Sequence, residues 1–411
     1  MKKISSLIME WIDARYPLTK SWKNHFSEYY VPKNFNFWYY FGSLAVFLLM
    51  LQIVTGIWLT MYYTPTANEA LDSVELTMRY VPYGWLLRYC HVVGASGFFV
   101  VVLLHIFRGL MYGSYKKPRE LVWLVGVFIY ILLIVESFMG YLLPWGQMSY
   151  WGAKVITSLF ETIPVYGEKI VEWMRGDFTI SGITLHRFYA LHVIGIPLII
   201  VIAVFMHIVF LHEVGSNNPD GIEIRDKKDP KGFPIDGVPL YPYYVVKDIF
   251  ALAVFLLVFC AIVFYKPDFW GYFLEVANFQ PANPLMTPEH IVPPWYMTPF
   301  YAILRAIPYK LGGVMAMFLS MGLLFFVPWL DRSPIKSIRY RSKIVKFALG
   351  IFVVSFIGLS YLGMRPLTKS TLLAAQIFTV LYFAYFLLMP IYTRFEGVKS
   401  LPDRIYKEIV G

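Results

Sequence analysis

The chain has 411 residues and is strongly apolar: 58% of its residues are hydrophobic, 15% are charged, and the net charge is +10. Runs of about 20 apolar residues recur along it, and each is long enough to cross a hydrocarbon core of roughly 30 Å. This composition excludes a soluble protein and indicates an all-α, polytopic membrane protein in contact with lipids. The positive charge is interpreted as a signal of membrane topology, and we expect no nucleic-acid partner.

In chain order, the apolar runs predict eight membrane spans, near residues 37–62, 85–111, 121–143, 185–212, 247–266, 311–330, 343–363 and 371–395. If residue 1 lies in the cytoplasm, about two dozen Lys and Arg lie on that side and roughly eleven on the other, as the positive-inside rule requires. We therefore expect a bacterial inner-membrane protein with both termini in the cytoplasm, and we call that side the inner side.

The N-terminal segment 1–36 begins with two lysines but lacks the apolar core and cleavage site of a signal peptide. Apolar residues repeat in it at helical spacing, at Ile4, Leu7, Ile8, Trp11 and Ile12. We expect a short helix that lies on the membrane surface.

Two pairs of histidines lie within the second and fourth predicted spans, His91 with His105 and His192 with His207. Imidazole inside a membrane-length helix is costly unless something coordinates it. The 14 residues between the first pair advance a helix by roughly 21 Å and return to nearly the same face. Two facing helices of this kind, within a di-haem bundle of the first four spans, would offer two stacked bis-histidine sites, the arrangement needed to hold two haems and pass electrons across a bilayer.

The second pair is 15 residues apart, so a regular helix would turn its imidazoles about 60° away from each other. Gly195 and Pro197 lie between them, and we predict a kink or a wide turn there. His186 is the competing ligand, but it lies beside Arg187 at the expected membrane edge, and we interpret it as interfacial.

Cys90 and Cys260 are the only cysteines, and neither belongs to a C-x-x-C-H motif. We therefore expect no disulfide and no covalently attached haem.

Glycines repeat at the same period as the first histidine pair, Gly42 with Gly56 in the first span and Gly126 with Gly140 in the third. Glycine costs about 1 kcal/mol relative to alanine inside a helix, so the repeat needs a reason. A porphyrin can approach the backbone only where no Cβ intervenes. Helix packing through small residues is the alternative.

Arg88 and Arg108 each lie three residues from a histidine, near a span end. Such arginines could pair with haem propionates, or they could anchor the helix at the membrane surface.

The chain resembles cytochrome b, the membrane core of the quinol:cytochrome c oxidoreductase (cytochrome bc) complex, from about Phe35 to Arg394. The resemblance is carried by the histidine and glycine spacings and by four motifs, GYLLPWGQMSYWGAKVIT at 140–157, LHEVGSNNP at 211–219, YPYYVVKD at 241–248 and PPWYMTPFYAILRAIP at 293–308. The 15-residue pair is similar to the chloroplast-type branch, although this chain is fused like the mitochondrial type.

The resemblance implies two non-covalent haems b. His91 and His192 would bind the low-potential haem near the outer side, with Arg88 on its propionates. His105 and His207 would bind the high-potential haem near the inner side. Further residues implied near the inner haem are Arg108, Ser114 and Trp123.

The resemblance also implies a respiratory enzyme that oxidises quinol at an outer site and reduces quinone at an inner site, and so contributes to proton translocation. Its implied partners are a Rieske iron–sulfur protein, a cytochrome c-type subunit and a second copy of the complex. For the inner site we expect His212, Ser216, Lys247 and Asp248, because reducing a quinone requires two protons near its carbonyl oxygens.

Two long loops should build the outer site, 144–184 and 267–310. Aromatic and methionine side chains suit a flat apolar ring, and for this site we expect Phe138, Tyr141, Met148, Gly152, Ile156, Pro293, Trp295, Tyr296 and Met297.

Position 294 departs from the family, whose usual signature is Pro-Glu-Trp-Tyr and not Pro-Pro-Trp-Tyr. The carboxylate commonly assigned to proton release is therefore absent at Pro294. We expect the proton to leave through water, Tyr141 or a neighbour such as Glu289, and an easily oxidised menaquinol-type substrate to compensate for the missing base.

The predicted division places an interfacial segment at 1–36, the di-haem bundle with the first outer loop at 37–215, and a C-terminal four-helix part at 216–411. Two other functions are open: a di-haem membrane anchor of a dehydrogenase or hydrogenase, which usually has four or five spans, and a haem-free transporter with histidine proton relays, which predicts inverted repeats.

Overall fold

The computed structural model describes residues 2–397 and 399, and within them eight helices are long and apolar enough to cross a membrane. They span Phe37–Thr60, Gly84–Tyr112, Glu120–Leu142, Gly182–Val214, Leu240–Tyr265, Lys310–Leu330, Lys343–Gly363 and Lys369–Leu387. The predicted all-α, eight-span fold is confirmed. The last span ends at Leu387, earlier than the predicted 395, because a separate short helix containing Pro390 follows it.

The membrane-crossing α-helices are α3 (Phe41–Thr60), α5 (Gly84–Tyr112), α6 (Glu120–Leu142), α10 (Ile196–Val214), α11 (Val245–Tyr265), α13 (Lys310–Leu330), α14 (Lys343–Gly363) and α15 (Lys369–Leu387). Shorter α-helices are α1 (Lys2–Asp13), α2 (Leu18–Trp22), α4 (Ala70–Arg79), α7 (Gln147–Ser158), α8 (Gly167–Arg175), α9 (Gly182–Ala190), α12 (Thr298–Ala306) and α16 (Met389–Tyr392). The 3-10 and π turns are η1 (Lys23–Ser27), η2 (Phe37–Tyr40), η3 (Leu159–Thr162), η4 (Leu191–Gly195), η5 (Ile224–Asp226), η6 (Leu240–Tyr244), η7 (Phe269–Gly271), η8 (Val276–Phe279), η9 (Trp295–Met297) and η10 (Ile338–Tyr340).

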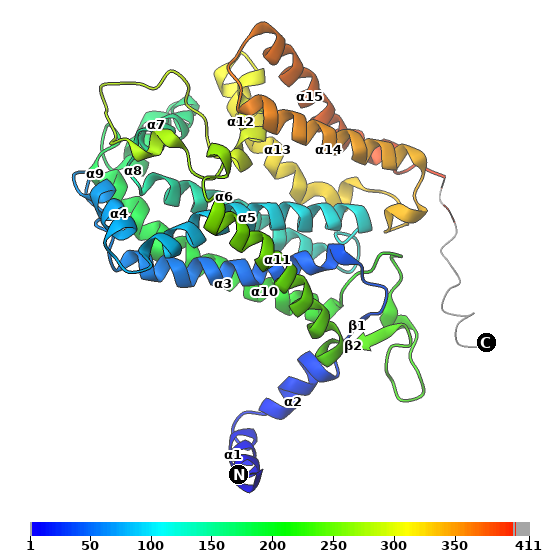
Figure 1. Cartoon of the computed structure of the whole chain (residues 1–411). Helices are drawn as coiled ribbons and strands as arrows, with labels where there is room; N and C mark the ends of the chain where they lie inside the picture. The colour runs from blue at the N-terminus through cyan, green and yellow to red at the C-terminus, as the bar shows by residue number, and fades with distance from the viewer. Residues whose placement is uncertain (1, 398, 400–411) are drawn as a thin grey trace.

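The first four spans form one bundle, in which α3 packs on α5 and α6 packs on α10 (Figure 1). The fifth span, α11, lies against α5, whereas α12, α13, α14 and α15 pack on one another as a second group. An antiparallel ribbon of β1 (Tyr30–Pro32) and β2 (Gly237–Pro239) joins two inner segments, with Val31 opposite Val238.

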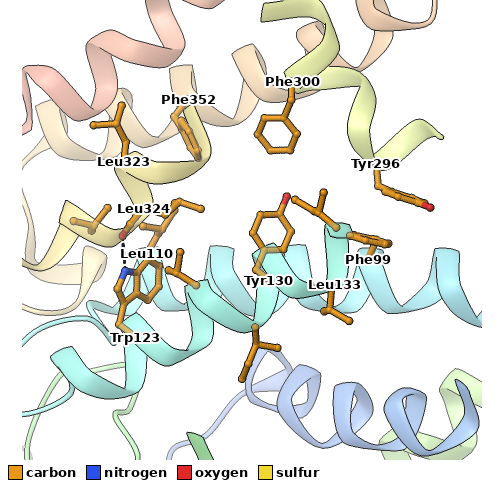
Figure 2. Close-up of a cluster of buried hydrophobic side chains, with 14 of the residues drawn as sticks. Phe99, Leu110, Trp123, Tyr130, Leu133, Tyr296, Phe300, Leu323, Leu324 and Phe352 are labelled. Carbon is orange, nitrogen blue, oxygen red and sulfur yellow. Dashed lines mark hydrogen bonds between the residues drawn. The ribbon is translucent and has the colours of Figure 1, made fainter. Parts of the chain in front are cut away.

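A buried aromatic cluster joins the two helix groups, with Phe99 and Tyr130 on one side and Phe300 and Phe352 on the other (Figure 2). The indole Nε1 of Trp123 donates a hydrogen bond to the Leu324 carbonyl at 2.7 Å across the same boundary. Helices within a bilayer associate through close packing and interhelical hydrogen bonds, and both are present here.

The fourth span is irregular between its two histidines. The regular turns of α9 end at Ala190, the π turn η4 covers Leu191–Gly195 with His192 inside it, and α10 continues from Ile196. A π turn absorbs one extra residue, so the 15-residue spacing no longer turns the imidazoles apart. The predicted irregularity is confirmed.

The N-terminal helix α1 projects away from the bundle (Figure 1). Leu7, Ile8 and Trp11 are exposed on it, at 61%, 54% and 60% of their surface. This exposure is what a membrane-surface helix would require, and that role stays a prediction.

Part of the basic charge on the inner side has fixed partners. The Asp331 carboxylate, fully buried, accepts from Lys116 at 3.1 Å and from Arg341 at 2.7 Å. Arg119 pairs with Glu223 at 2.6 Å.

The backbone N–H of residue 399 donates a hydrogen bond to the carbonyl of residue 340 in this region, so the described end of the chain lies on the side of the N-terminus.

Replacing Asp331 with asparagine should lower the free energy of unfolding by about 3–5 kcal/mol, because the buried Lys116 and Arg341 lose a shared counter-charge and only Arg341 keeps a second acidic partner, Glu396. Burial acts to raise the pKa of Asp331, but Arg341 and Lys116 outweigh it and hold the pKa below its usual value. The stabilisation is therefore present above the unfolded pKa of about 3.9 and is lost as pH falls through the folded pKa. Thermal unfolding in detergent checks this, with Asp226→Asn, an exposed position, as the control.

Candidate functional site

The two histidine pairs meet across the first bundle. The ring centroids of His91 and His192 are 6.2 Å apart, and those of His105 and His207 are 6.4 Å apart. Imidazole nitrogens bind metals at about 2.0–2.1 Å, so two rings on opposite sides of one metal ion have centroids roughly 6 Å apart. Both pairs therefore have the separation that a shared metal requires.

The Nδ1 atoms on the outer pair have defined hydrogen-bond partners. Thr55 Oγ1 lies 2.9 Å from His91 Nδ1. His192 Nδ1 lies 2.9 Å from the Glu136 carboxylate and 3.0 Å from the Glu136 carbonyl. Such partners orient a ligating imidazole and leave Nε2 for the metal. We did not predict Thr55 or Glu136, although a carboxylate inside an apolar span is a signal that could have identified Glu136.

Each predicted glycine lies against one of the four imidazoles. A Cβ on Gly42 would lie 3.4 Å from His105, one on Gly56 3.3 Å from His91, and one on Gly126 3.1 Å from His207. A Cβ on Gly140 would overlap His192. We expected the glycines to make room for a porphyrin, and in the structure each of them makes room for an imidazole ring.

The two arginines present buried polar atoms that lack partners. Arg88 is 8% exposed, and its Nη1 is buried without a hydrogen-bond partner. Arg108 donates from Nη1 to Ser114 at 3.2 Å, while its Nε is buried and unpartnered. A buried, unpartnered guanidinium is costly unless an anion accompanies it, so each site suits a ligand with carboxylates. Trp123 packs against Gly109, next to Arg108.

Within residues 2–397 and 399, no three His, Cys, Asp or Glu side chains cluster as a metal site. Each histidine pair supplies two imidazole donors only, so a metal held between them would need its remaining donors from a cofactor. The residues therefore fit a haem: two opposed imidazoles, a glycine against each ring, and a buried arginine at each site.

Beside the outer pair lies an apolar cavity of about 650 Å³, within the usual range of ligand pockets. Five predicted residues line it, namely Phe138, Gly152, Ile156, Pro293 and Met297.

The other four predicted outer residues lie behind the lining. Tyr296 is buried and stacks on Phe99 with ring centroids 3.8 Å apart (Figure 2). Trp295 donates to Ser96 at 3.3 Å, and Met148 is buried. Tyr141 contacts Gly152, and its hydroxyl donates to the carboxylate of Glu275, a residue we did not predict. Glu289, our predicted neighbour, is exposed.

The four predicted inner residues lie near one aromatic cluster, defined by the buried Tyr29, Val31 and Tyr244. His212 stacks on Tyr29 with ring centroids 4.3 Å apart, and Ser216 lies near the Tyr29 hydroxyl.

From the fifth span, Asp248 accepts a hydrogen bond from Ser43 at 3.0 Å. The Lys247 ammonium lies 5.8 Å from the Tyr244 ring. His25, whose ring centroid is 5.6 Å from that of His212, adds an imidazole that we did not predict.

The fold and these sites define a class: a multi-span membrane protein whose first four spans carry two stacked histidine pairs. Two family models match the chain, "Cytochrome b/b6/petB" over residues 26–215 and "Cytochrome b(C-terminal)/b6/petD" over residues 281–383. The chain is 56% identical to a cytochrome b of Allochromatium vinosum, over 97% of this chain and 98% of that protein. It is 49% identical to a cytochrome b of Rickettsia prowazekii, over 97% and 98%.

Among solved structures, a chain of a hyperthermophilic respiratory Complex III superposes with a TM-score of 0.87 at 39% identity, covering 94% of this chain and 98% of that one. The chain belongs to the cytochrome b/b6 family. Haem b and a role in electron transport follow from that membership.

Proposed function

We propose that this chain is the di-haem subunit of a quinol:cytochrome c oxidoreductase, which oxidises quinol on the outer side and reduces quinone on the inner side. The observation that carries the proposal is the pair of stacked histidine sites in one bundle, with an apolar cavity beside the outer site. We further propose that it works with a Rieske iron–sulfur protein and a cytochrome c-type subunit, as a dimer of the complex in a bacterial inner membrane, with both termini in the cytoplasm.

In this proposal His91 and His192 hold the outer, low-potential haem, and His105 and His207 hold the inner, high-potential one. When bound, the two haems would carry single electrons between the two sides of the membrane. The chain's own residues orient the ligands through Thr55 and Glu136 and offer Arg88 and Arg108 to the propionates.

The outer cavity binds the quinol ring between residues of α6, α7 and the loop before α12. Its lining is apolar, so the ring is held by packing and water is excluded. Glu275 supplies a carboxylate behind Tyr141. Because position 294 itself has no carboxylate, we propose an easily oxidised, menaquinol-type substrate, and turnover with menaquinol-type and ubiquinol-type substrates tests this.

At the inner site, Asp248 and His212 are proposed to deliver protons to the quinone oxygens. Replacing Asp248 with asparagine should slow haem reoxidation by quinone about 10²-fold, the lower end of what a positioned acid contributes. Outer-site quinol oxidation should stay near its normal rate and serves as the internal control. Stopped-flow haem spectra follow both half-reactions, and equal loss of both would contradict a proton-delivery role.

The proposed function is tested by adding quinol to the purified complex and following the haem absorption. We expect b-type bands that are reduced by quinol in two kinetically or potentiometrically distinct steps. A protein whose bands are absent, or do not respond to any quinol, would contradict the proposal.

A further inference from the structure

The outer loop between α11 and α12 directs one carboxylate into the protein. Glu275 is half-buried, although the next residue, Val276, is 76% exposed and Trp270 earlier in the loop is 69% exposed. The carboxylate therefore lies one residue away from an exposed position of the loop. Glu275 lies outside the Pro-Pro-Trp-Tyr motif at 293–296, in which Pro294 replaces the family's usual glutamate.

Tyr141 links this carboxylate with the lining of the outer cavity through one hydrogen bond and one packing contact. The Tyr141 hydroxyl donates to the Glu275 carboxylate. The Tyr141 ring lies against Gly152, where an added Cβ would be 3.6 Å from it, and Gly152 lines the cavity. Tyr141 thus stands between the cavity and the carboxylate.

The loop that carries Glu275 is fixed to α7. Asn278 Oδ1 accepts from the backbone N–H of Ser149 at 2.7 Å, and the Gln280 carbonyl accepts from the backbone N–H of Gln147 at 2.9 Å. A catalytic group needs such support, because small displacements of a proton acceptor cost much of its effect.

The groups that face Glu275 are two phenols, Tyr141 from α6 and Tyr296 from η9. Within residues 2–397 and 399, no Lys or Arg forms an ion pair with it. Burial consequently raises the pKa of Glu275 to about 7, against the opposite effect of the Tyr141 hydrogen bond. A general base works best when its pKa lies near the working pH.

We propose that Glu275 accepts a proton from quinol through Tyr141 and releases it to the outer side. The inference rests on the proposed function. Oxidation of one quinol to quinone releases two electrons and two protons. One electron would pass to the outer haem, and the other electron together with one proton would pass to the iron–sulfur partner. The second proton passes from the quinol hydroxyl to the Tyr141 oxygen as Tyr141 gives its own proton to Glu275, which then loses it to water.

The test compares the intact complex carrying Glu275→Gln with one carrying Glu168→Gln, an exposed glutamate of the other outer loop. The readout is the rate of haem reduction by quinol as a function of pH. We expect Glu275→Gln to lower the maximal rate about 10²-fold with little change in KM, and to abolish an ionisation near pH 7 that the unmodified protein shows. Glu168→Gln should match the unmodified protein.

A second variant restores the carboxylate at a different position. Adding Pro294→Glu to Glu275→Gln should recover most of the rate, and Glu275→Asp alone should keep the rate and shift the ionisation. A Glu275→Gln complex with normal haem spectra, a normal rate and an unchanged pH profile would overturn the inference. A Glu275→Asp complex that is as slow as the Glu275→Gln complex would also overturn the inference. The Glu275→Asp variant keeps the inference testable if Glu275→Gln prevents assembly of the complex. Unmodified protein that fails to oxidise quinol would instead overturn the proposed function.

Discussion

Replacing His105 with leucine should remove the inner haem and leave the outer one. The His105 and His207 rings have the separation that one metal ion between them requires, and leucine has no nitrogen to donate. A haem with one protein ligand is held by packing alone, so we expect one haem per chain in place of two. The outer pair, roughly 21 Å away along the helix, should keep its spectrum.

The control for this variant is His186→Leu, which changes an exposed histidine on α9 and should leave both haems in place. Haem quantitation and a potentiometric titration of the α-band measure the effect. A His105→Leu protein that retains two haems with unchanged spectra would show that the ligand assignment is wrong.

Replacing Gly140 with alanine should disrupt the outer haem site. The new Cβ would overlap the His192 ring, and the ring cannot retreat freely because its Nδ1 is held by Glu136. Overpacking of this kind costs about 1–3 kcal/mol, and here it displaces a proposed metal ligand. We expect loss or altered potential of the outer haem with the inner haem unchanged.

The matched control is Gly322→Ala, because a Cβ at that helical glycine would meet no atom within 4 Å. Gly42→Ala offers a graded comparison, since its Cβ would make ordinary contact with His105 at 3.4 Å. If Gly140→Ala and Gly322→Ala had the same haem content and potentials, the close packing of Gly140 on His192 would have no role in the site.

The spans could be predicted because the hydrocarbon core imposes length and apolarity on every crossing helix. The π turn at Leu191–Gly195 was predictable because 15 residues cannot align two imidazoles on a regular helix. The four histidines could also be identified from the sequence, because the spacing of residues within one helix is a local property.

The side chains that contact these histidines and the other site residues could not be predicted from sequence spacing. Tyr141 and Glu275 lie 134 residues apart in the chain, and Thr55 reaches His91 from a different helix. His212 stacks on Tyr29 although the two residues lie far apart in the chain. Such contacts depend on how helices approach one another, which no local pattern encodes. Glu289 is exposed in the structure, and its role in proton release stays a prediction.

Pyridine haemochrome quantitation on the purified protein tests directly whether each histidine pair holds a haem, with the haem b concentration divided by the polypeptide concentration. We predict two haems b per chain, one for each histidine pair. A value of one, or a preparation without haem after expression in a haem-replete host, would contradict the claim that both pairs are haem sites.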